Sequence, residues 1–380
     1  MNRLHSRRLR CKSERGIALL ATMLAIALMV IIVVDFTSSS ALGYLSAASH
    51  ANEIRASYLA RSAINVGLAL IAQDTRSQQA QAGASGAAAP ATGASGTAAP
   101  ASGSPGTSAP AGGGTGVAAP SAPFDSYASV WAVPFPPMQV NGGTVQLSVV
   151  DEARKFDINR LVIGTLPNTG SPAPPDAGQG QLAPGQIDPK GVMQLTQLFA
   201  MLGLSPAIVP AIVDWLDRDS IESPGGAEAD YYLRLIPPYE PRNGPMPTIG
   251  DLHLVKGVDD ATFSKLRNYL TVAPEPLVNI NTASPEVIAC LEPELARNPR
   301  LVETIIQARA LRPFSNMLDV LNLLEVSGDV QQKLSNELGT TTQNFSISGV
   351  GSYAAARKLV FATFRRNSDG TATLASWQED

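Results

Sequence analysis

The chain has 380 residues, 16% of them charged, with a formal net charge of −4. Ordinary soluble domains carry about 25% charged residues, and the low net charge excludes a strong bulk attraction to nucleic acid or to an anionic membrane surface. With two cysteines and three scattered histidines, a disulfide framework, a thiolate zinc site and a histidine-rich metal centre are excluded as well.

The N-terminus combines a basic segment with an apolar run. Residues 1–15 hold six basic side chains and one acid, and Ile17 to Val34 is an uncharged run of 18 residues. As a helix it would measure roughly 27 Å, close to the ~30 Å hydrocarbon core of a bilayer. The basic flank favours a cytoplasmic N-terminus, so we expect a single-pass inner-membrane anchor with the bulk of the chain in the periplasm. A cleaved secretory signal peptide is the alternative, with residues 38–41 (SSSA) as its cleavage site.

The junction between these two parts, Arg15-Gly16 followed by Ile17-Ala18-Leu19-Leu20-Ala21, resembles the leader of type IV pilins and pseudopilins. The resemblance implies that a prepilin peptidase cuts after Gly16 and methylates Ile17. Most members carry a Glu at the fifth mature position, which here is Ala21. Because a buried ammonium without a partner is costly, we expect a subunit without this acid to sit at the filament tip. In this departure the chain resembles the protein K family of type II secretion, the large minor pseudopilins.

The next segments are predicted to be a stalk and a linker. Apolar residues at mostly three-to-five spacing predict an amphipathic helix to about Gln73. From Ser77 to Phe124 there is no charged residue, and Ala82 to Pro123 contains only Ala, Gly, Ser, Thr, Pro and Val. Such a segment has nothing to bury, so we expect it to be disordered and to carry no chemistry.

Strands are predicted on both sides of a helical region. Tyr127 to Trp131 and Gly143 to Val150 have strand composition, and the Asn141-Gly142-Gly143 turn between them predicts a hairpin. Gln343 to Val350 and Ala356 to Arg366 predict two further strands. This order predicts an α+β fold, in which the N-terminal helix packs on an antiparallel, pilin-like sheet and the all-α part is an insertion.

The resemblance covers most of the chain outside the low-complexity segment, including residues 151–161, DEARKFDINRL. The expected parts are a cleaved leader (1–16), a transmembrane and amphipathic stalk helix (17–76), a disordered linker (77–123), a sheet domain (124–165 and 341–372), a first helical domain with an acidic loop (186–275) and a second helical domain of helix-hairpin-helix or SAM-like type (276–340).

The densest cluster of charge lies in the first helical domain. Six carboxylates occur within the 17 residues from Asp214 to Asp230, where a predicted helix runs into a Gly-Gly turn. Hard oxygen ligands in a flexible loop suit Ca²⁺, which takes six to eight of them. A solvated acidic loop, with some acids paired to Arg218 and Arg234, is the alternative.

The pattern D-W-x-D-x-D followed by G-A-E-x-x-Y-Y in this cluster resembles the protein K family, and the resemblance implies calcium binding. The candidate ligands are Asp217, Asp219, Glu222, Glu228 and Asp230.

The second helical unit raises the question of nucleic-acid binding. The course from residue 278 to residue 321 resembles the helix-hairpin-helix fold of DNA-uptake receptors. The DNA-binding form needs a Gly-rich hairpin, because only Gly lets backbone N–H groups approach phosphate closely. The corresponding segment, 291–297, reads LEPELAR, with no Gly, two acids and a Pro. We therefore expect no nucleic-acid binding.

No nucleophile–base pair, phosphate loop or catalytic zinc signature occurs in the sequence, so we do not expect an enzyme. The resemblance implies a minor pseudopilin that caps the tip of the type II secretion pseudopilus and supports protein export across the outer membrane. Its implied partners are the other minor pseudopilins of the tip, the major pseudopilin, the prepilin peptidase and the inner membrane. The alternative function is a membrane-anchored, exported helix-hairpin-helix module that binds nucleic acid or cell wall. Cys290 has no partner once the leader is removed, and we expect it to be buried.

Overall fold

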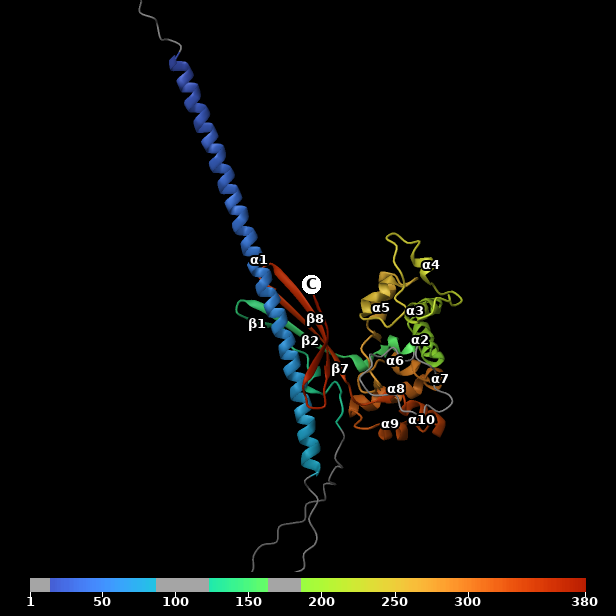
Figure 1. Ribbon diagram of the computed structural model, residues 1–380. Coiled ribbons are helices and arrows are strands. Elements are labelled where there is room, and N and C mark those ends of the chain that lie inside the picture. Colours follow the sequence, from blue (N-terminus) through green and yellow to red (C-terminus); the bar gives the residue numbers. More distant parts are fainter. Residues whose placement is uncertain (1–13, 87–122, 163–185) are drawn as a thin grey trace, which may run out of the picture.

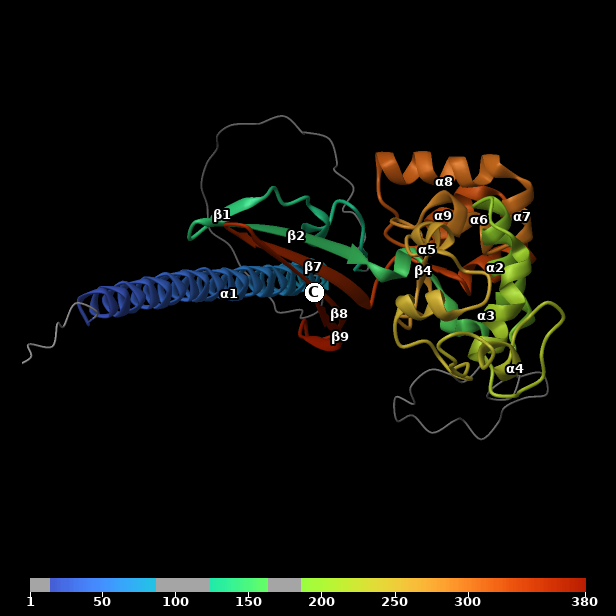
Figure 2. The ribbon, with the colours of Figure 1, turned by 90° about the horizontal axis from the view of Figure 1, so that it is seen from above.

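The structure, a computed structural model, describes residues 14–86, 123–162 and 186–380 (Figure 1). Most of the predicted leader, most of the predicted linker and the Pro/Gly-rich loop that follows Val162 lie outside the described residues. The described parts are a long N-terminal helix, a five-stranded sheet packed along it, and a helical block beyond one end of the sheet (Figures 1 and 2).

Helix α1 (Glu14–Gly86) is continuous over 73 residues and measures roughly 110 Å at about 1.5 Å per residue. Residues 18–47 are all exposed, and this part projects away from the rest of the molecule (Figure 1). From Ala56 onward one face is buried against the sheet, as the apolar spacing predicts. The helix runs past residue 76, the predicted end of the stalk, because residues 77–82 (SQQAQA) consist mainly of good helix formers.

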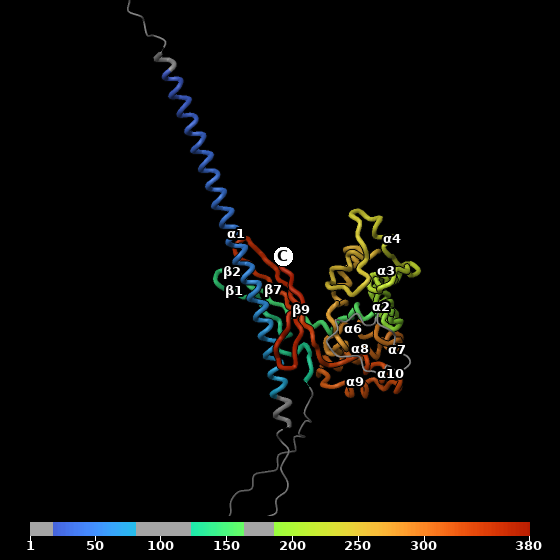
Figure 3. Tube along the Cα trace, in the orientation of Figure 1, coloured from blue at the N-terminus to red at the C-terminus, as the bar shows by residue number. Residues whose placement is uncertain are grey.

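The sheet is antiparallel throughout and has the order β1-β2-β7-β8-β9. Its strands are β1 (Met138–Val140), β2 (Gly143–Asp151), β7 (Asn344–Tyr353), β8 (Ala356–Arg366) and β9 (Ala372–Glu379). β2 and β7 are neighbours, although the whole helical block lies between them in the sequence (Figure 3).

The first predicted strand, Tyr127 to Trp131, is wrong. The segment contains the start of a short 3₁₀ helix, η1 (Val130–Ala132), and the partner of β2 is the shorter strand β1. A two-residue turn at Asn141 and Gly142, both at positive φ, pairs the residues directly flanking it. Trp131 is instead buried edge-on against Phe345, with ring centroids 5.1 Å apart. Strand β9 was not predicted, and it extends the sheet beyond residue 372.

α1 approaches β7 more closely than side chains would allow. A Cβ atom on Gly351 would lie 2.0 Å from the carbonyl oxygen of Ala56, and one on Gly349 would lie 2.3 Å from that of Ala60. Glycine at these two positions therefore lets the helix backbone rest directly on the strand. We call this contact the glycine seam.

The helical block consists of nine described α-helices and two short parallel strand pairs, joined by short 3₁₀ helices. The helices are α2 (Pro189–Met201), α3 (Val209–Leu216), α4 (Ala229–Tyr232), α5 (Asp260–Leu266), α6 (Pro285–Cys290), α7 (Pro293–Arg297), α8 (Pro299–Leu311), α9 (Met317–Leu324) and α10 (Gly328–Ser335). The strand pairs are β3 (Phe156–Asp157) with β4 (Leu270–Thr271) and β5 (Val278–Asn279) with β6 (Leu338–Gly339). The 3₁₀ helices are η2 (Glu152–Arg154), η3 (Ile158–Leu161), η4 (Pro206–Ile208) and η5 (Ile249–Leu254).

One apolar core runs through the block, from Phe156 to Leu338, and contains residues of both predicted helical domains. Cys290 lies in this core as a fully buried free cysteine, which confirms the prediction made for it. Burial raises the pKa of its thiol to about 12, so the group is inert near neutral pH.

The block is attached to a particular end of the sheet. The chain enters it at the end of β2 and returns at the start of β7, where Asp151 pairs with Phe345. Gly67 of α1 contacts Ile347 near this end, whereas Ala56 contacts Gly351 farther along the same strand. The block therefore joins the sheet beside the C-terminal part of α1, far from its exposed apolar part (Figure 2).

Candidate functional site

The acidic loop begins where α3 ends. α3 is almost entirely buried, and its C-terminal flank, Asp217, turns into extended backbone. The loop returns to the block at Glu228, immediately before α4. A rigid apolar helix and a short second helix thus fix both ends of a segment rich in carboxylates.

Asp214, inside α3, organises this loop. It is fully buried, and its carboxylate accepts hydrogen bonds from the backbone N–H of Ser223 at 3.2 Å and of Ala227 at 2.8 Å. A Cβ atom on Gly226 would lie 1.9 Å from its Oδ2. The Gly-Gly turn is therefore needed so that the loop backbone can pass directly over this carboxylate.

Three of the predicted ligands come together. Asp217, Asp219 and Glu228 each place a carboxylate oxygen within 4.8 Å of the others. Asp217 and Glu228 are only 2% and 5% exposed, yet Asp217 Oδ1 and both Glu228 carboxylate oxygens have no hydrogen-bond partner among the described residues. Buried carboxylate oxygens without donors are costly.

The pKa values of the two buried acids, Asp217 and Glu228, are raised for a plain physical reason. Burial, together with the negative charges of Asp219, Asp214 and Glu228, raises the pKa of Asp217 to about 7. Burial and the charges of Asp214 and Asp219 likewise raise the pKa of Glu228 to about 7. A cation placed among them would offset both effects, since a positive charge within a few ångströms favours the ionised carboxylate.

The other two predicted ligands are placed differently. Glu222 is exposed but lies near enough for its charge to contribute to the raised pKa of Glu228. Asp230 is exposed on α4 and is not one of the three converging acids. Arg218 and Arg234 are exposed as well, and the ion pairs of the described residues do not join them to the loop acids.

Two residues outside the predicted set support the loop from the far side. The Lys256 ammonium donates to the carbonyl oxygen of Gly226 at 2.7 Å and lies over the ring of Tyr231, 4.9 Å from its centroid. The Asn243 side chain donates to the carbonyl oxygen of Asp219 at 3.0 Å. Sequence reasoning included Asp214 in the acidic cluster but gave it no role, and it missed Lys256 and Asn243. The only sequence signal for the role of Asp214 was the Gly-Gly pair, since burial cannot be read from a local pattern.

The processing positions lie at the start of α1. Gly16 and Ile17 belong to this helix, and Ala21 is exposed on it. The stretch Ala18–Ala80 is long and apolar enough to cross a membrane, with a mean hydropathy of 2.7 in its most apolar window, which is 0% buried.

Comparisons with known proteins agree on one family. Two family models for type II secretion system (T2SS) protein K match residues 154–275 and 278–341. The type II secretion system protein K of Pseudomonas aeruginosa is 27% identical over 65% of this chain and 69% of its own length. That of Klebsiella pneumoniae is 26% identical over 81% of this chain and 79% of its own.

A solved structure shares the fold. A chain in the crystal structure of the GspK-GspI-GspJ complex from the enterotoxigenic Escherichia coli type 2 secretion system aligns with a TM-score of 0.53 and 18% identity, covering 68% of this chain and 87% of that one. The region matched by the first of the two family models includes the acidic loop. The chain therefore belongs to the type II secretion system protein K family, whose members are minor pseudopilins and structural parts of the secretion machinery, not enzymes.

Proposed function

We propose that this minor pseudopilin caps the tip of the type II secretion pseudopilus and so supports protein export across the outer membrane. The observation that carries the proposal is where the helical block is attached. It joins the strand ends farthest from the exposed apolar part of α1 (Figure 1). If that apolar part enters the filament core, the block lies beside the sheet on the side away from it, where it would hinder a further subunit from stacking.

The absence of an acid at position 21 also supports a position at the tip of the pseudopilus. With Ile17 as the first mature residue, the fifth position is Ala21, so this helix offers no carboxylate to a neighbour's terminal ammonium. Burying that ammonium without a partner costs several kcal/mol in real proteins. The cost is avoided if no subunit is added above this one.

The partners we propose are the other minor pseudopilins of the tip and the major pseudopilin. The solved relative is in a complex with GspI and GspJ. In this chain, the exposed part of α1 carries Leu42, Tyr44 and Leu45 beyond the length that a bilayer needs. Packing against neighbouring stem helices would remove these side chains from water.

We further propose that a prepilin peptidase cuts after Gly16 and that Ile17 becomes the methylated N-terminus. Before assembly, α1 would anchor the chain in the inner membrane as a single span, with its N-terminus in the cytoplasm and the bulk in the periplasm. The basic residues ahead of the apolar run support this orientation.

Calcium is the proposed cofactor of the acidic loop. Three converging carboxylates, two of them buried with orphaned oxygens, fit a hard cation that prefers oxygen ligands. Asp217, Asp219 and Glu228 would hold the ion, which would supply positive charge and fix the loop on the block.

We assign the second helical unit to the helix-hairpin-helix or SAM-like type. We propose that it does not bind nucleic acid, because α7 and the acids Glu292 and Glu294 occupy the hairpin region that would face phosphate.

Co-expression of the full chain with the other minor pseudopilins tests the proposed function. We expect a stable ternary complex after detergent extraction, and immunolabelling at filament ends only. Ala21→Glu should allow labelled subunits to appear along the shaft, while Thr22→Glu, one position away, should not. Even spacing of the wild-type chain along the shaft, or salt-sensitive retention on DNA in place of the complex, would overturn the proposal.

A further inference from the structure

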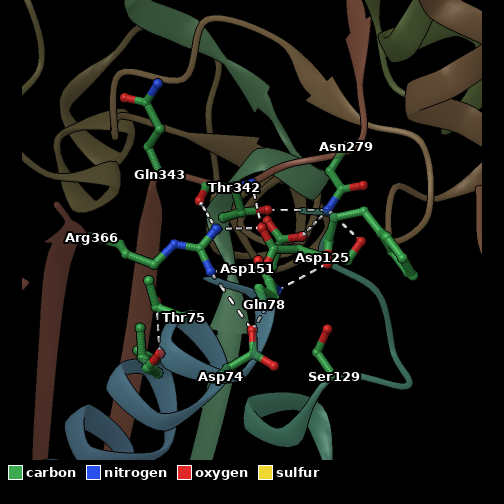
Figure 4. A network of polar contacts seen from close by, with 12 residues as sticks. Asp74, Thr75, Gln78, Asp125, Ser129, Asp151, Asn279, Thr342, Gln343 and Arg366 are labelled. Atoms are coloured by element: carbon green, nitrogen blue, oxygen red, sulfur yellow. Dashed lines mark hydrogen bonds and ion pairs between the residues drawn. The ribbon is translucent and has the colours of Figure 1, made fainter. Parts of the chain in front are cut away.

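The joint between the sheet and the helical block contains a buried cluster of polar side chains (Figure 4). It draws Asp74 from α1, Asp125 from the segment before η1, Asp151 from the end of β2, Asn279 from β5 and Arg366 from the end of β8. The three carboxylates are 4%, 0% and 1% exposed. The cluster therefore holds three acids and one guanidinium in the interior.

Arg366 neutralises mainly one of these acids. Its guanidinium donates to both carboxylate oxygens of Asp125, whereas its nearest approach to Asp74 is 3.8 Å. It also donates to the carbonyl oxygen of Thr342 at 2.6 Å. Within the described part of the chain, Asp151 is thus left without a cation of its own, and a further acid, Glu275, adds to the negative charge from the neighbouring chain segment.

The hydrogen bonds of Asp151 cross the joint. Its Oδ2 accepts from the Thr282 hydroxyl and from the Asn279 amide, the latter at 3.0 Å. Its Oδ1 accepts from the backbone N–H of Arg154 at 3.1 Å. The Thr282 hydroxyl has a second acceptor within reach, the carbonyl oxygen of Asn279 at 3.5 Å. This hydroxyl can therefore point either to the sheet or back into its own segment.

We propose that Asp151 and Thr282 form a proton-operated latch between the sheet and the second helical unit. In the ionised state the Thr282 hydroxyl donates to Asp151. When Asp151 takes up a proton from solvent, its new O–H donates to Thr282 Oγ1, and the Thr282 hydroxyl turns to donate to the carbonyl oxygen of Asn279. The hydrogen bond between the two side chains is kept with its direction reversed, one bond to the carbonyl oxygen of Asn279 is added, and the cluster loses one of its excess negative charges.

The charges around Asp151 agree with this direction. Burial, with a further contribution from the charge of Asp125, raises the pKa of Asp151 to about 6, against the hydrogen bond from Thr282. Burial also raises the pKa of Asp74 and raises that of Glu275 to about 8. Arg366 faces the cluster as its cation, and the adjacent Glu152 is paired with Lys155 at 2.8 Å.

Protonation of Asp151 favours the closed joint. A carboxyl group whose pKa is raised on folding stabilises the closed joint fully below its unfolded pKa, and this contribution is lost as the pH rises through the folded pKa. For Asp151 the window runs from about 4 to about 6. The latch is therefore tighter in acid and looser at neutral pH.

The test is amide hydrogen exchange of residues 278–283 in the full chain, in detergent and with calcium present, at pH 4.5 and pH 7. Exchange in the wild type is divided by exchange in Asp151→Asn at the same pH, which cancels the intrinsic pH dependence of the chemistry. We expect this ratio to be about tenfold higher at pH 7 than at pH 4.5. Asp259→Asn, at an exposed helix cap, should give no such change.

Thr282→Val supplies a second readout if Asp151→Asn folds poorly. The ionised carboxylate then loses a donor, so the midpoint of the exchange profile should move to higher pH. Infrared difference spectra should show a buried protonated carboxyl band that shifts with this variant. A wild-type to Asp151→Asn ratio that is constant with pH, or a midpoint unmoved by Thr282→Val, overturns the latch.

Discussion

The sheet makes two large contacts, one with α1 and one with the helical block, and different interactions hold them together. Along the glycine seam, α1 and β7 meet backbone to backbone at Gly349 and Gly351, and the core beneath is apolar. At the joint with the helical block, buried acids surround Arg366. A cavity of about 680 Å³ lies beside this joint, between the block and the face of the sheet opposite α1. The seam should therefore respond to changes in volume and the joint to changes in charge.

The largest effect is expected at the joint. Arg366→Met leaves Asp125 buried without its cation, and breaking a buried pair from one side costs about 3–5 kcal/mol of stability. Urea unfolding of the full chain in detergent measures the loss. Arg365→Met, the exposed neighbour on β8, is the matched control and should change stability by less than about 0.5 kcal/mol. Equal effects of the two substitutions would contradict the distinction between joint and surface.

The seam should be sensitive to a single methyl group. In Gly351→Ala the new Cβ would overlap the carbonyl oxygen of Ala56, 2.0 Å away, so the helix must move off the strand at a cost of about 2–3 kcal/mol. Gly328→Ala is the control, because nothing lies within 4 Å of the corresponding Cβ. A Gly351→Ala protein as stable as Gly328→Ala would show that the seam is looser than described.

Calcium binding at the acidic loop should depend on pH. Asp217 and Glu228, each with a pKa raised to about 7, must lose their protons to bind the ion, so affinity should rise by about tenfold or more from pH 6 to pH 8. Without calcium, the same raised pKa values make stability fall as the pH rises toward 7. Titration calorimetry in two buffers of different ionisation heat measures both affinity and proton release.

Variants of the loop sharpen this prediction. Asp217→Asn should abolish binding, whereas Asp230→Asn, outside the converging group, should leave affinity unchanged. Retained binding in Asp217→Asn would remove the site, and a large loss in Asp230→Asn would show that the loop rearranges around the ion.

The smallest effect is expected for a partly exposed ion pair between α1 and β9. Arg61 of α1 pairs with Glu379 of β9 at 2.6 Å, with side chains 49% and 24% exposed. Such pairs contribute about 0–1 kcal/mol and weaken with salt. A double-mutant cycle with Arg61→Ala and Glu379→Gln, repeated at low and high salt, checks this. A coupling above about 1 kcal/mol that persists in high salt would place the pair in the structural core of the seam.

Much of this fold was predictable because its signals are local. The spacing of apolar residues predicted helix α1, the Asn141-Gly142 turn located a hairpin, and β-branched runs located β7 and β8. The first hairpin strand failed because Trp131 has strand character but finds its partner, Phe345, in the core. β9 was missed because it is largely exposed and lacks a clear alternation of apolar and polar residues.

The candidate site was predictable in composition and less so in arrangement. Clustering of acids pointed to Asp217, Asp219 and Glu228, which the structure brings together. The same pattern could not show that Glu222 and Asp230 are exposed, or that Asp214 points into the loop. The polar joint was invisible, because Asp125 and Arg366 lie near opposite ends of the globular sequence and meet only through the fold.

The two strands that lead into and out of the helical block are adjacent, with Asp151 opposite Phe345. Neighbouring strands lie about 4.8 Å apart, so the entry and exit points of some 190 residues of intervening chain are almost coincident. A unit tethered in this way can differ in size without disturbing the register of β2 and β7, and the contact of α1 with β7 does not depend on it.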